Sequence, residues 1–310
     1  MTTAEQSELR IWIDTDPALH YTEEERPKDI DDAFVIVEAI GDPRVDVAGI
    51  STVFGNSPAA VGTIVAGDLV RLTEANVLVV EGAAEAGSPE NGFPQSQAVG
   101  AMAEALRQGP LSIVAIGPLT NVAALLEHFP EEARQIDEVV IVAGRSVDQV
   151  FEIHGATGVP DFNFESDAHA GLRLMESGVP VALTGFELTS QVVLTREHLT
   201  ALSCRSPVAD SIVAGAVPWL EWWTGVFPED GGFHPWDSAA LAYLTHPEWF
   251  VREPRGWRIR PSPTGAPGTP ATPWLELGSE LPGPTATYCP GFTPGGADAF
   301  IQQIIDGVPS

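Results

Sequence analysis

Short apolar runs alternate with amphipathic stretches over the first two thirds of the chain. Runs rich in β-branched and aromatic residues predict strands at Leu9–Asp14, Val45–Val53, Val77–Val80, Leu111–Ile116, Val139–Ala143 and Val179–Thr184. The stretches between them predict helices at 31–40, 58–72, 97–107, 120–128 and 167–177. Because strands that alternate with helices build βαβ units, we predict an α/β fold with an open, mostly parallel sheet and helices on both faces.

The last third of the chain follows a different pattern. After Thr195 the segments are mostly helical, and helices are predicted at Pro235–Leu244 and Ala297–Ile305. Residues 252–295 are rich in proline and glycine, which predicts a turn-rich surface excursion with short strands and without a second core. We find no internal repeat, so the prediction is a single domain over residues 1–310.

Charge narrows the possible functions. The 310 residues contain 15 Lys and Arg against 43 Asp and Glu, a formal charge of −28, and Lys28 is the single lysine. This charge repels phosphate, so a nucleic-acid partner is not expected, and Lys28 lies in no phosphate-loop motif. Two cysteines are too few for a cysteine-based zinc site. No apolar signal stretch or membrane span is found, so we expect a cytoplasmic protein without a membrane partner.

Acidic residues collect where the first strand ends. Asp14 and Asp16 are two residues apart, so their side chains share one face of the strand and repel each other unless a cation or proton lies between them. A turn is the alternative explanation, since Asp and Pro favour turns. Asp29, Asp31 and Asp32 precede the next helix, where a single acid would suffice as a cap. A hard cation such as calcium takes six to eight oxygen ligands and would use both groups.

Further polar side chains follow other predicted strands or begin helices: Asn56, Thr120, Asn121, Asp161, Asn163 and Asp237. Each of them alone is compatible with a turn or a helix cap. Ligands of open parallel sheets bind at the carboxyl edge, and these residues share that edge. Their common position indicates a site.

Seven motifs carry a family resemblance when they are taken in order. They are IDTDP at 13–17, DDA at 31–33, GISTVFGN at 49–56, VAIGPLTNVA at 114–123, VVIVAG at 139–144, DFNFESDAHAG at 161–171 and WDSAALAYL at 236–244. Over nearly the whole chain this sequence resembles the nucleoside hydrolase family of the inosine-uridine-preferring type. The resemblance implies hydrolysis of the N-glycosidic bond of a ribonucleoside or related N-riboside to free base and ribose. It also implies a part in purine or pyrimidine salvage, and a homodimer or homotetramer.

The resemblance implies a tightly bound Ca²⁺ at the carboxyl edge of the sheet. Asp16, Asp32, Asp237 and the backbone carbonyl of Thr120 would be its ligands. Asp14 would orient these ligands from behind. Asp16 would also take a proton from the attacking water.

The resemblance implies substrate contacts as well. Asp31 would hold the ribose 2′- and 3′-hydroxyls, and Asn163 would contact the sugar hydroxyls. Asn56 would steady the catalytic water and Asp16. An oxocarbenium-like sugar is favoured by such acidic surroundings.

Three departures from the family pattern affect the base and the 5′ end of the sugar. Thirteen residues, Ala18–Ile30, separate DTDP from DD where members have about two, and this insertion either covers the pocket or is a solvated loop. Trp236 replaces a histidine thought to help the leaving base; it could stack on a base, and His234 is the nearest candidate acid. Asp161 stands in place of a sugar-loop glutamate, and Gly155 in place of an asparagine.

Two other functions stay open from the sequence. A haloacid-dehalogenase-like phosphohydrolase would use Asp14 as nucleophile, Asp16 as acid and base, and magnesium, but it needs a later lysine that this chain lacks. A nucleoside-binding or sugar-binding protein without turnover would fit the missing histidine. The tryptophan-rich stretch Trp219–Trp223 is an apolar patch, core or pocket wall.

Overall fold

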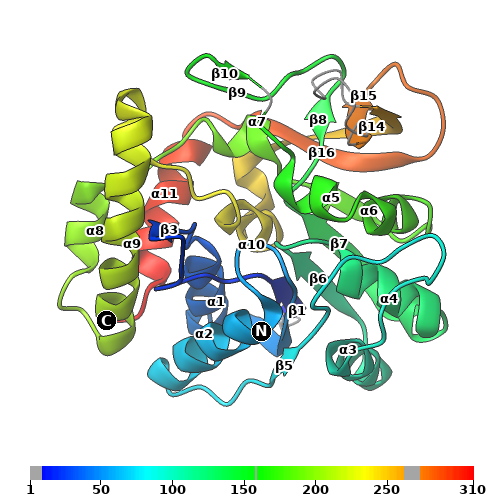
Figure 1. The fold of residues 1–310 in the computed structure, drawn as a ribbon, viewed down its shortest axis with the longest axis horizontal. Helices are drawn as coiled ribbons and strands as arrows, with labels where there is room; N and C mark the ends of the chain where they lie inside the picture. The colour runs from blue at the N-terminus through cyan, green and yellow to red at the C-terminus, as the bar shows by residue number, and fades with distance from the viewer. Residues whose placement is uncertain (1–8, 158, 262–272) are drawn as a thin grey trace, which may run out of the picture.

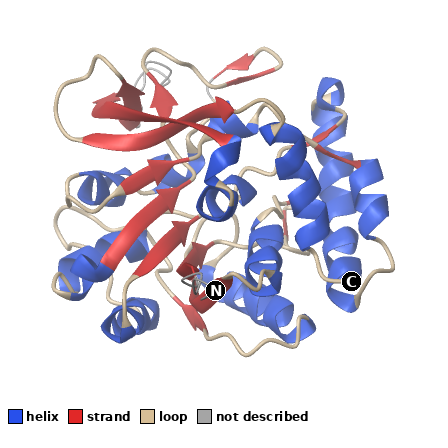
Figure 2. Cartoon of the chain, turned by 180° about the vertical axis from the view of Figure 1, so that it is seen from behind, coloured by secondary structure: helices blue, strands red, loops and turns tan. Residues whose placement is uncertain are grey.

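The computed structural model describes residues 9–157, 159–261 and 273–310, and a ten-stranded sheet runs through its centre (Figures 1 and 2). The strand order is β5 (Val79–Glu81), β4 (Val45–Thr52), β1 (Leu9–Thr15), β6 (Leu111–Ala115), β7 (Ile136–Ile141), β11 (Val181–Leu183), β16 (Thr285–Phe292), β14 (Phe250–Pro261), β15 (Pro273–Gly278) and β8 (Arg145–Ser146). Neighbours from β5 to β16 are parallel, whereas β14 is antiparallel to both of its neighbours. The predicted mostly parallel sheet is confirmed.

Helices cover both faces of the sheet (Figure 2). One face carries α1 (Asp32–Gly41), α2 (Ala59–Leu72), α8 (Arg196–Leu202), α9 (Pro207–Val226), α10 (Ser238–Thr245) and α11 (Gly296–Gly307), and the other α3 (Gln97–Gln108), α4 (Thr120–His128) and α6 (Ala168–Met175). A hydrophobic core lies on each face of the sheet, and successive residues of a strand point alternately into the two cores. In β1, Ile11 and Ile13 face one core and Trp12 faces the other. Strands buried on both faces explain the continuous apolar runs of the sequence.

The segment 252–295 differs from its prediction. Its described residues belong to long strands of the central sheet, because β14 has 12 residues and β16 has eight and pairs with β11. The surface excursion with short strands is therefore wrong for them, and residues 262–272 lie outside the described residues. Proline and glycine misled the prediction because they sit within the strands: β14 has a bulge after Val251, and a Cβ at Gly256 would lie 2.1 Å from the Leu281 carbonyl oxygen.

Smaller elements lie between the main helices and strands. They are β2 (Thr22–Glu23), β3 (Arg26–Pro27), β9 (Glu152–Ile153), β10 (Ala156–Thr157), α5 (Phe162–Ser166), α7 (Phe186–Thr189), β12 (Leu194–Thr195) and β13 (Gly232–Phe233), with 3₁₀ turns at Glu132–Gln135, Pro228–Asp230 and Pro247–Trp249. Strands β2 and β3 form a hairpin inside the predicted insertion, and β3 lies beside α9 (Figure 1). Among the described residues, no helix has the length and apolar character needed to cross a membrane.

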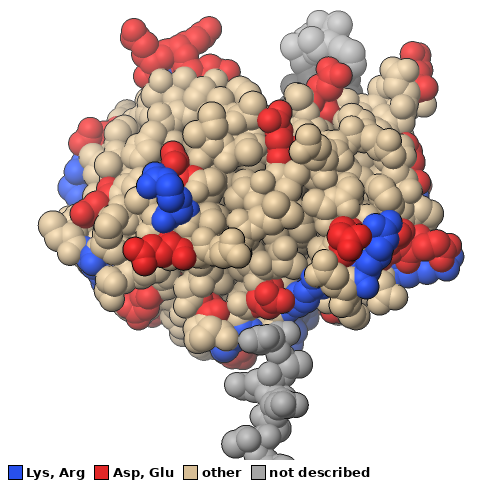
Figure 3. Space-filling view, turned by 90° about the horizontal axis from the view of Figure 1, so that it is seen from below, with Lys and Arg blue, Asp and Glu red and all other residues tan. Residues whose placement is uncertain are grey.

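Acidic side chains are scattered over the surface. On the face drawn in Figure 3, Asp and Glu are dispersed, and the basic side chains lie close to acidic ones without forming a continuous patch of described residues. Together with the formal charge of −28, this face offers no surface for a phosphate backbone.

Candidate active site

Strand ends and loops enclose a cavity of about 410 Å³ at the carboxyl edge of the sheet. The loops after β1, β4, β6 and β7 all reach it, because parallel strands end on the same side. Its walls are made by Asp16, Arg26, Lys28, Asp29, Asp31, Asn56, Ile116, Val142, Phe151, Ile153, Val159, Pro160, Asp161, Phe162, Asn163, Phe186, Trp219, Trp223, Trp236 and Asp237. Seven of the eleven site residues predicted from the sequence therefore line one cavity.

Three acids meet at the base of the cavity. One carboxylate oxygen from each of Asp31, Asp32 and Asp237 lies within 4.8 Å of the others, and the Asp237 amide donates to Asp31 Oδ2 at 2.7 Å. Asp32 Oδ1 accepts from the Thr15 hydroxyl and, at 3.2 Å, from the Asp16 amide. The other oxygen, Asp32 Oδ2, is buried and has no hydrogen-bond partner among the described residues. An unpartnered carboxylate oxygen inside a group of acids fits a bound cation.

Burial and mutual repulsion disfavour the charged forms of these acids. The pKa of Asp32 is raised to about 7 by burial and by the charge of Asp31. Burial, with the charges of neighbouring acids, also holds the pKa values of Asp16 and Asp237 well above the usual range. A cation among them would reverse these effects, since it becomes the largest local charge.

The loop that follows β4 holds the side chain of Asp16. Its Oδ2 accepts from the Asn56 amide at 2.6 Å, and the Asn56 side chain donates to the Asp29 carbonyl oxygen at 2.9 Å. Gly55, with φ of 153°, allows this approach, because a Cβ there would lie 2.0 Å from Asp16 Oδ2. Asp14 does not line the cavity. It lies behind, where its Oδ1 accepts from Ser51 and Asn121 at 2.5 and 2.9 Å.

The loop after β10 contributes Asp161, and the short helix α5 that follows it contributes Asn163. Asp161 Oδ2 accepts from the Gly144 amide at 2.7 Å, and burial raises its pKa to about 7 although the charge of Arg145 opposes the shift. The Asn163 side-chain amide donates to the carbonyl oxygens of Ile116 and Val142, which directly follow β6 and β7. These bonds fix the loop to the sheet edge and orient both side chains.

Arg145 is a supporting residue that the sequence analysis missed. Its guanidinium lies between the rings of Phe151 and Trp274, 3.9 and 3.8 Å from their centres, and it donates to Glu165 at 2.9 Å. Glu165 in turn accepts from the Asp161 amide at 2.9 Å. The signal in the sequence was weak, because an arginine after a strand is ordinarily a surface residue.

Aromatic rings form the opposite wall. Trp236 is stacked on Phe186 with ring centres 5.2 Å apart and planes 13° apart, and Phe186 is stacked on Phe151 at 4.4 Å. Trp219 and Trp223 of α9 also line the cavity, so two rings of the tryptophan-rich stretch are pocket wall. Flat rings suit stacking on a nucleobase.

The structure does not bring His234 or Thr120 to the cavity wall. His234 is 4% exposed, its Nδ1 lies 2.7 Å from the Val192 carbonyl oxygen, and burial lowers its pKa. All seven histidines belong to the described residues, and none of them lines the cavity. Thr120 is fully buried and donates its hydroxyl to Asp167 at 2.6 Å. A proton-donating histidine for the leaving base is therefore absent from this wall.

Residues 11–278 match the model of the inosine-uridine preferring nucleoside hydrolase family. The chain belongs to this family. A non-specific ribonucleoside hydrolase (RihC) of Salmonella schwarzengrund is 29% identical over 267 residues, which cover 78% of this chain and 80% of that protein. The RihC protein of Klebsiella pneumoniae is 27% identical over 285 residues, 84% of this chain and 87% of its own length.

Solved structures of nucleoside hydrolases share the fold. The plant nucleoside hydrolase PpNRh1 has a TM-score of 0.78 at 18% identity and covers 98% of this chain and 99% of its own. A purine-preferring ribonucleoside hydrolase from Gardnerella vaginalis has a TM-score of 0.76 at 20% identity, with 96% and 99% coverage.

As a nucleoside hydrolase, this protein is an enzyme that acts on nucleosides. The family match decides against the haloacid-dehalogenase-like phosphohydrolase.

The insertion of this nucleoside hydrolase reaches the active-site cavity. Arg26 and Lys28 line the cavity together with Asp29, so the hairpin covers part of it instead of standing free in solvent. Leu19 is 4% exposed, and its Cδ1 would lie 2.3 Å from a Cβ at Gly215 of α9. The unusual length of the insertion indicated in the sequence that it could reach the cavity. The sequence analysis did not predict that Arg26 and Lys28 line the cavity.

Proposed function

We propose that this enzyme hydrolyses the N-glycosidic bond of a ribonucleoside or a related N-riboside, with a bound calcium ion, and releases the free base and ribose. The observation that carries the proposal is the acid group at the base of the cavity, where Asp32 Oδ2 is buried without a partner among the described residues. The family membership supports the reaction class. The ribonucleoside hydrolases among the relatives support the ribose.

Oxygen ligands for a hard cation are at hand. Asp16, Asp32 and Asp237 would hold the ion, and the position of Asp31 adds a fourth carboxylate near it. When bound, calcium would lower the pKa of a coordinated water and help to hold the vicinal diol of the ribose. All-oxygen ligands favour calcium or magnesium over zinc.

The protein's own groups would then act on the sugar. Asp16, which the backbone N–H of Asn56 holds in place, would accept the proton of the attacking water. Asp31 and Asn163 would hold the sugar hydroxyls, and Asp161 lines the same cavity. These acidic walls would favour the positive charge that develops on the ribose as the bond to the base breaks.

The aromatic wall would receive the base. Trp236 and Phe186 would stack on it and exclude water from the cleaving bond. His234 is not proposed as the leaving-group acid, because both its burial and its bond to Val192 keep it away from the wall.

The test is a panel of purine and pyrimidine ribonucleosides, with free base and reducing sugar measured together. We expect cleavage of at least one substrate, loss of activity after exhaustive chelation, and recovery with Ca²⁺ but not with Mg²⁺. The Asp16→Asn variant should keep its circular dichroism spectrum and lose at least about 10³-fold in kcat. Full turnover by metal-free protein would contradict the proposed mechanism, and recovery with Mg²⁺ alone would contradict the assignment of calcium.

A further inference from the structure

The cavity wall has no histidine that could protonate the departing base, but it carries two basic side chains. Histidines are absent from the wall, and the two basic side chains that line it, Arg26 and Lys28, both come from the insertion. The chain has 15 basic residues against 43 acidic ones, and Lys28 is its only lysine. Two basic side chains at one cavity are therefore unusual for a chain of this acidic composition.

The hairpin is anchored to helix α9 at several points. The Arg26 guanidinium lies 3.9 Å above the ring of Trp222, which is stacked on Trp219 at 5.0 Å. His20 Nε2 lies 3.1 Å from the Ser211 hydroxyl, and Leu19 packs against Gly215. The turn residues Glu24 and Glu25 both have positive φ, as a tight two-residue hairpin turn requires. These contacts place Arg26 beside the aromatic part of the cavity wall, to which Trp219 belongs.

The two cations differ in their partners. Lys28 Nζ lies 2.6 Å from Glu23 Oε2 on the same hairpin, so its charge is already paired. Arg26 makes no hydrogen bond or ion pair with a residue in 9–157, 159–261 or 273–310, and only its flat face is occupied, by Trp222. The N–H groups at the edge of the guanidinium therefore remain available to a ligand, and stacking on an indole limits the freedom of the side chain.

We propose that Arg26 is a catalytic residue of the leaving-group half of the site: its guanidinium binds acceptor atoms of the base and stabilises the negative charge that the base gains as the C1′–N bond breaks. This inference rests on the proposed function. The electron pair of the C1′–N bond moves to the base nitrogen, while the water oxygen bonds to C1′ and its proton passes to Asp16. Arg26 donates hydrogen bonds but keeps its protons, and the released base takes its proton from solvent.

The experiment compares a poor and a good leaving group on the same sugar. The substrates are a ribonucleoside that the wild-type enzyme cleaves and 4-nitrophenyl β-D-ribofuranoside, whose phenolate leaves without help. Arg26→Met removes the charge and Arg26→Lys keeps it, while Arg196→Met removes an exposed arginine that pairs with Glu221 of α9, as a matched control.

We expect Arg26→Met to lower kcat for the nucleoside by about 10²-fold and to change kcat for the nitrophenyl riboside by less than about threefold. Arg26→Lys should recover part of the loss, and Arg196→Met should match the wild type on both substrates. An equal loss on both substrates, or no loss on either, would overturn the inference and leave the proposed function intact. A wild-type protein that cleaves neither substrate would overturn both. Should Arg26→Met fail to fold, as judged by its melting temperature, Arg26→Gln takes its place.

Discussion

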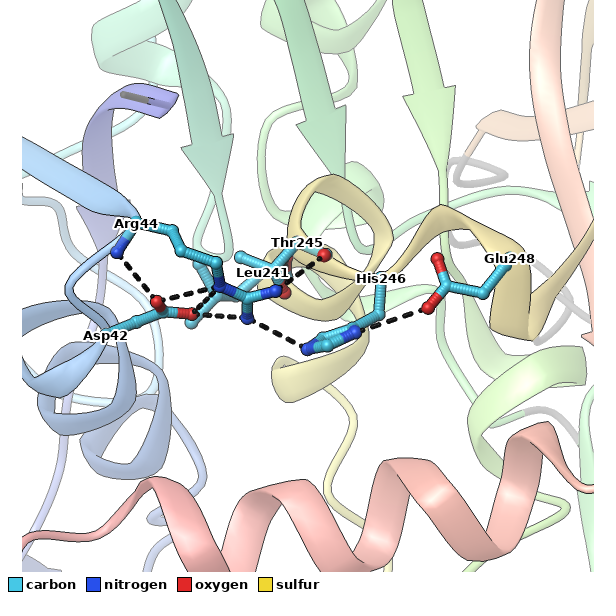
Figure 4. Close-up of polar contacts among 6 residues, drawn as sticks. All are labelled: Asp42, Arg44, Leu241, Thr245, His246 and Glu248. Atoms are coloured by element: carbon cyan, nitrogen blue, oxygen red, sulfur yellow. Dashed lines mark hydrogen bonds and ion pairs between the residues drawn. The ribbon is translucent and has the colours of Figure 1, made fainter. Parts of the chain in front are cut away.

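At its two ends, helix α1 carries acidic side chains in opposite environments. Asp31 and Asp32 lie at its N-terminal end, at the carboxyl edge of the sheet, and are buried among other acids. At the other end, Asp42 receives three hydrogen bonds from the Arg44 guanidinium, and Arg44 continues to His246 and on to Glu248 (Figure 4).

The pKa shifts at the two ends have opposite signs. Burial raises the pKa of Asp32 to about 7, whereas the hydrogen bond from Arg44 lowers the pKa of Asp42 even though burial opposes it. At the end of α1 that has only a structural role, Asp42 is paired with Arg44. At the end where a ligand is expected, Asp31 and Asp32 have no basic partner among the described residues. Unpaired buried charge costs stability, so it is a stronger sign of function than acidity itself.

The largest expected effect is at the unpaired end. Asp32→Asn should abolish metal binding and lower kcat by at least about 10³-fold. It should also raise the stability of the metal-free protein by about 1 kcal/mol, because it removes a charge from a repelling group. Activity assays and thermal melts after chelation would measure both. A variant that is inactive and also less stable without metal would contradict the idea that this end of the helix is arranged for a cation.

Calcium should stabilise the wild type through the same acids. At a free concentration 100 times the dissociation constant, binding to the folded state alone adds about 2.7 kcal/mol. We expect an increase of several degrees in melting temperature on adding Ca²⁺ to chelated protein. Asp32→Asn should lose this increase and Asp42→Asn should keep it, so equal responses of the two variants would break the comparison.

Local patterns in the sequence predicted the sheet and the edge at which the acids meet. The buried strands are visible in the sequence as apolar runs; Asp14 and Asp16 lie at the end of such a run, and Asp31 directly precedes an apolar helix. The orientation of side chains that depends on distant loops was not predictable. His234 faces Val192 because of the pairing of β12 with β13, and the Asn56 side chain turns to the Asp29 carbonyl of the insertion. Strands β14 and β16 were missed because their proline and glycine residues belong to a bulge and close approaches.

The middle of α1 carries a third acid that sharpens the comparison. Glu38 is 4% exposed and its Oε1 has no hydrogen-bond partner among the described residues, yet it does not line the cavity. Burial and, to a lesser extent, the charge of Asp42 raise its pKa from 4.5 to about 8. The group therefore contributes stability below pH 4.5 that is lost as the pH rises through about 8.

The Glu38→Gln variant should not show the loss of stability that ionisation of Glu38 causes at high pH. With calcium saturating, wild-type protein should lose roughly 2 kcal/mol more than Glu38→Gln between pH 5 and pH 9, since relaxation and water penetration reduce the full shift. Denaturant unfolding at the two pH values measures the difference, and kcat at pH 7 should be unchanged. Identical pH profiles would show that an unpaired buried acid on this helix carries no cost, which would weaken the interpretation of Asp32.

The smallest effect is expected at the paired end. The Arg44 side chain is 44% exposed, so its ion pair with Asp42 is screened by solvent, and Arg44→Met should cost less than about 1 kcal/mol. The lowered pKa of Asp42 means that its stabilisation is present above the unfolded pKa of 3.8 and is lost as the pH falls through the folded value. The variant should therefore differ from wild type in unfolding experiments at pH 6 and converge with it at strongly acidic pH. Arg71→Met removes an exposed pair with Asp68 and serves as the matched control.

Because no part of the network of Asp42, Arg44, His246 and Glu248 touches the cavity, Arg44→Met should leave nucleoside turnover unchanged. Any change in turnover would show that the two ends of α1 are coupled and not independent.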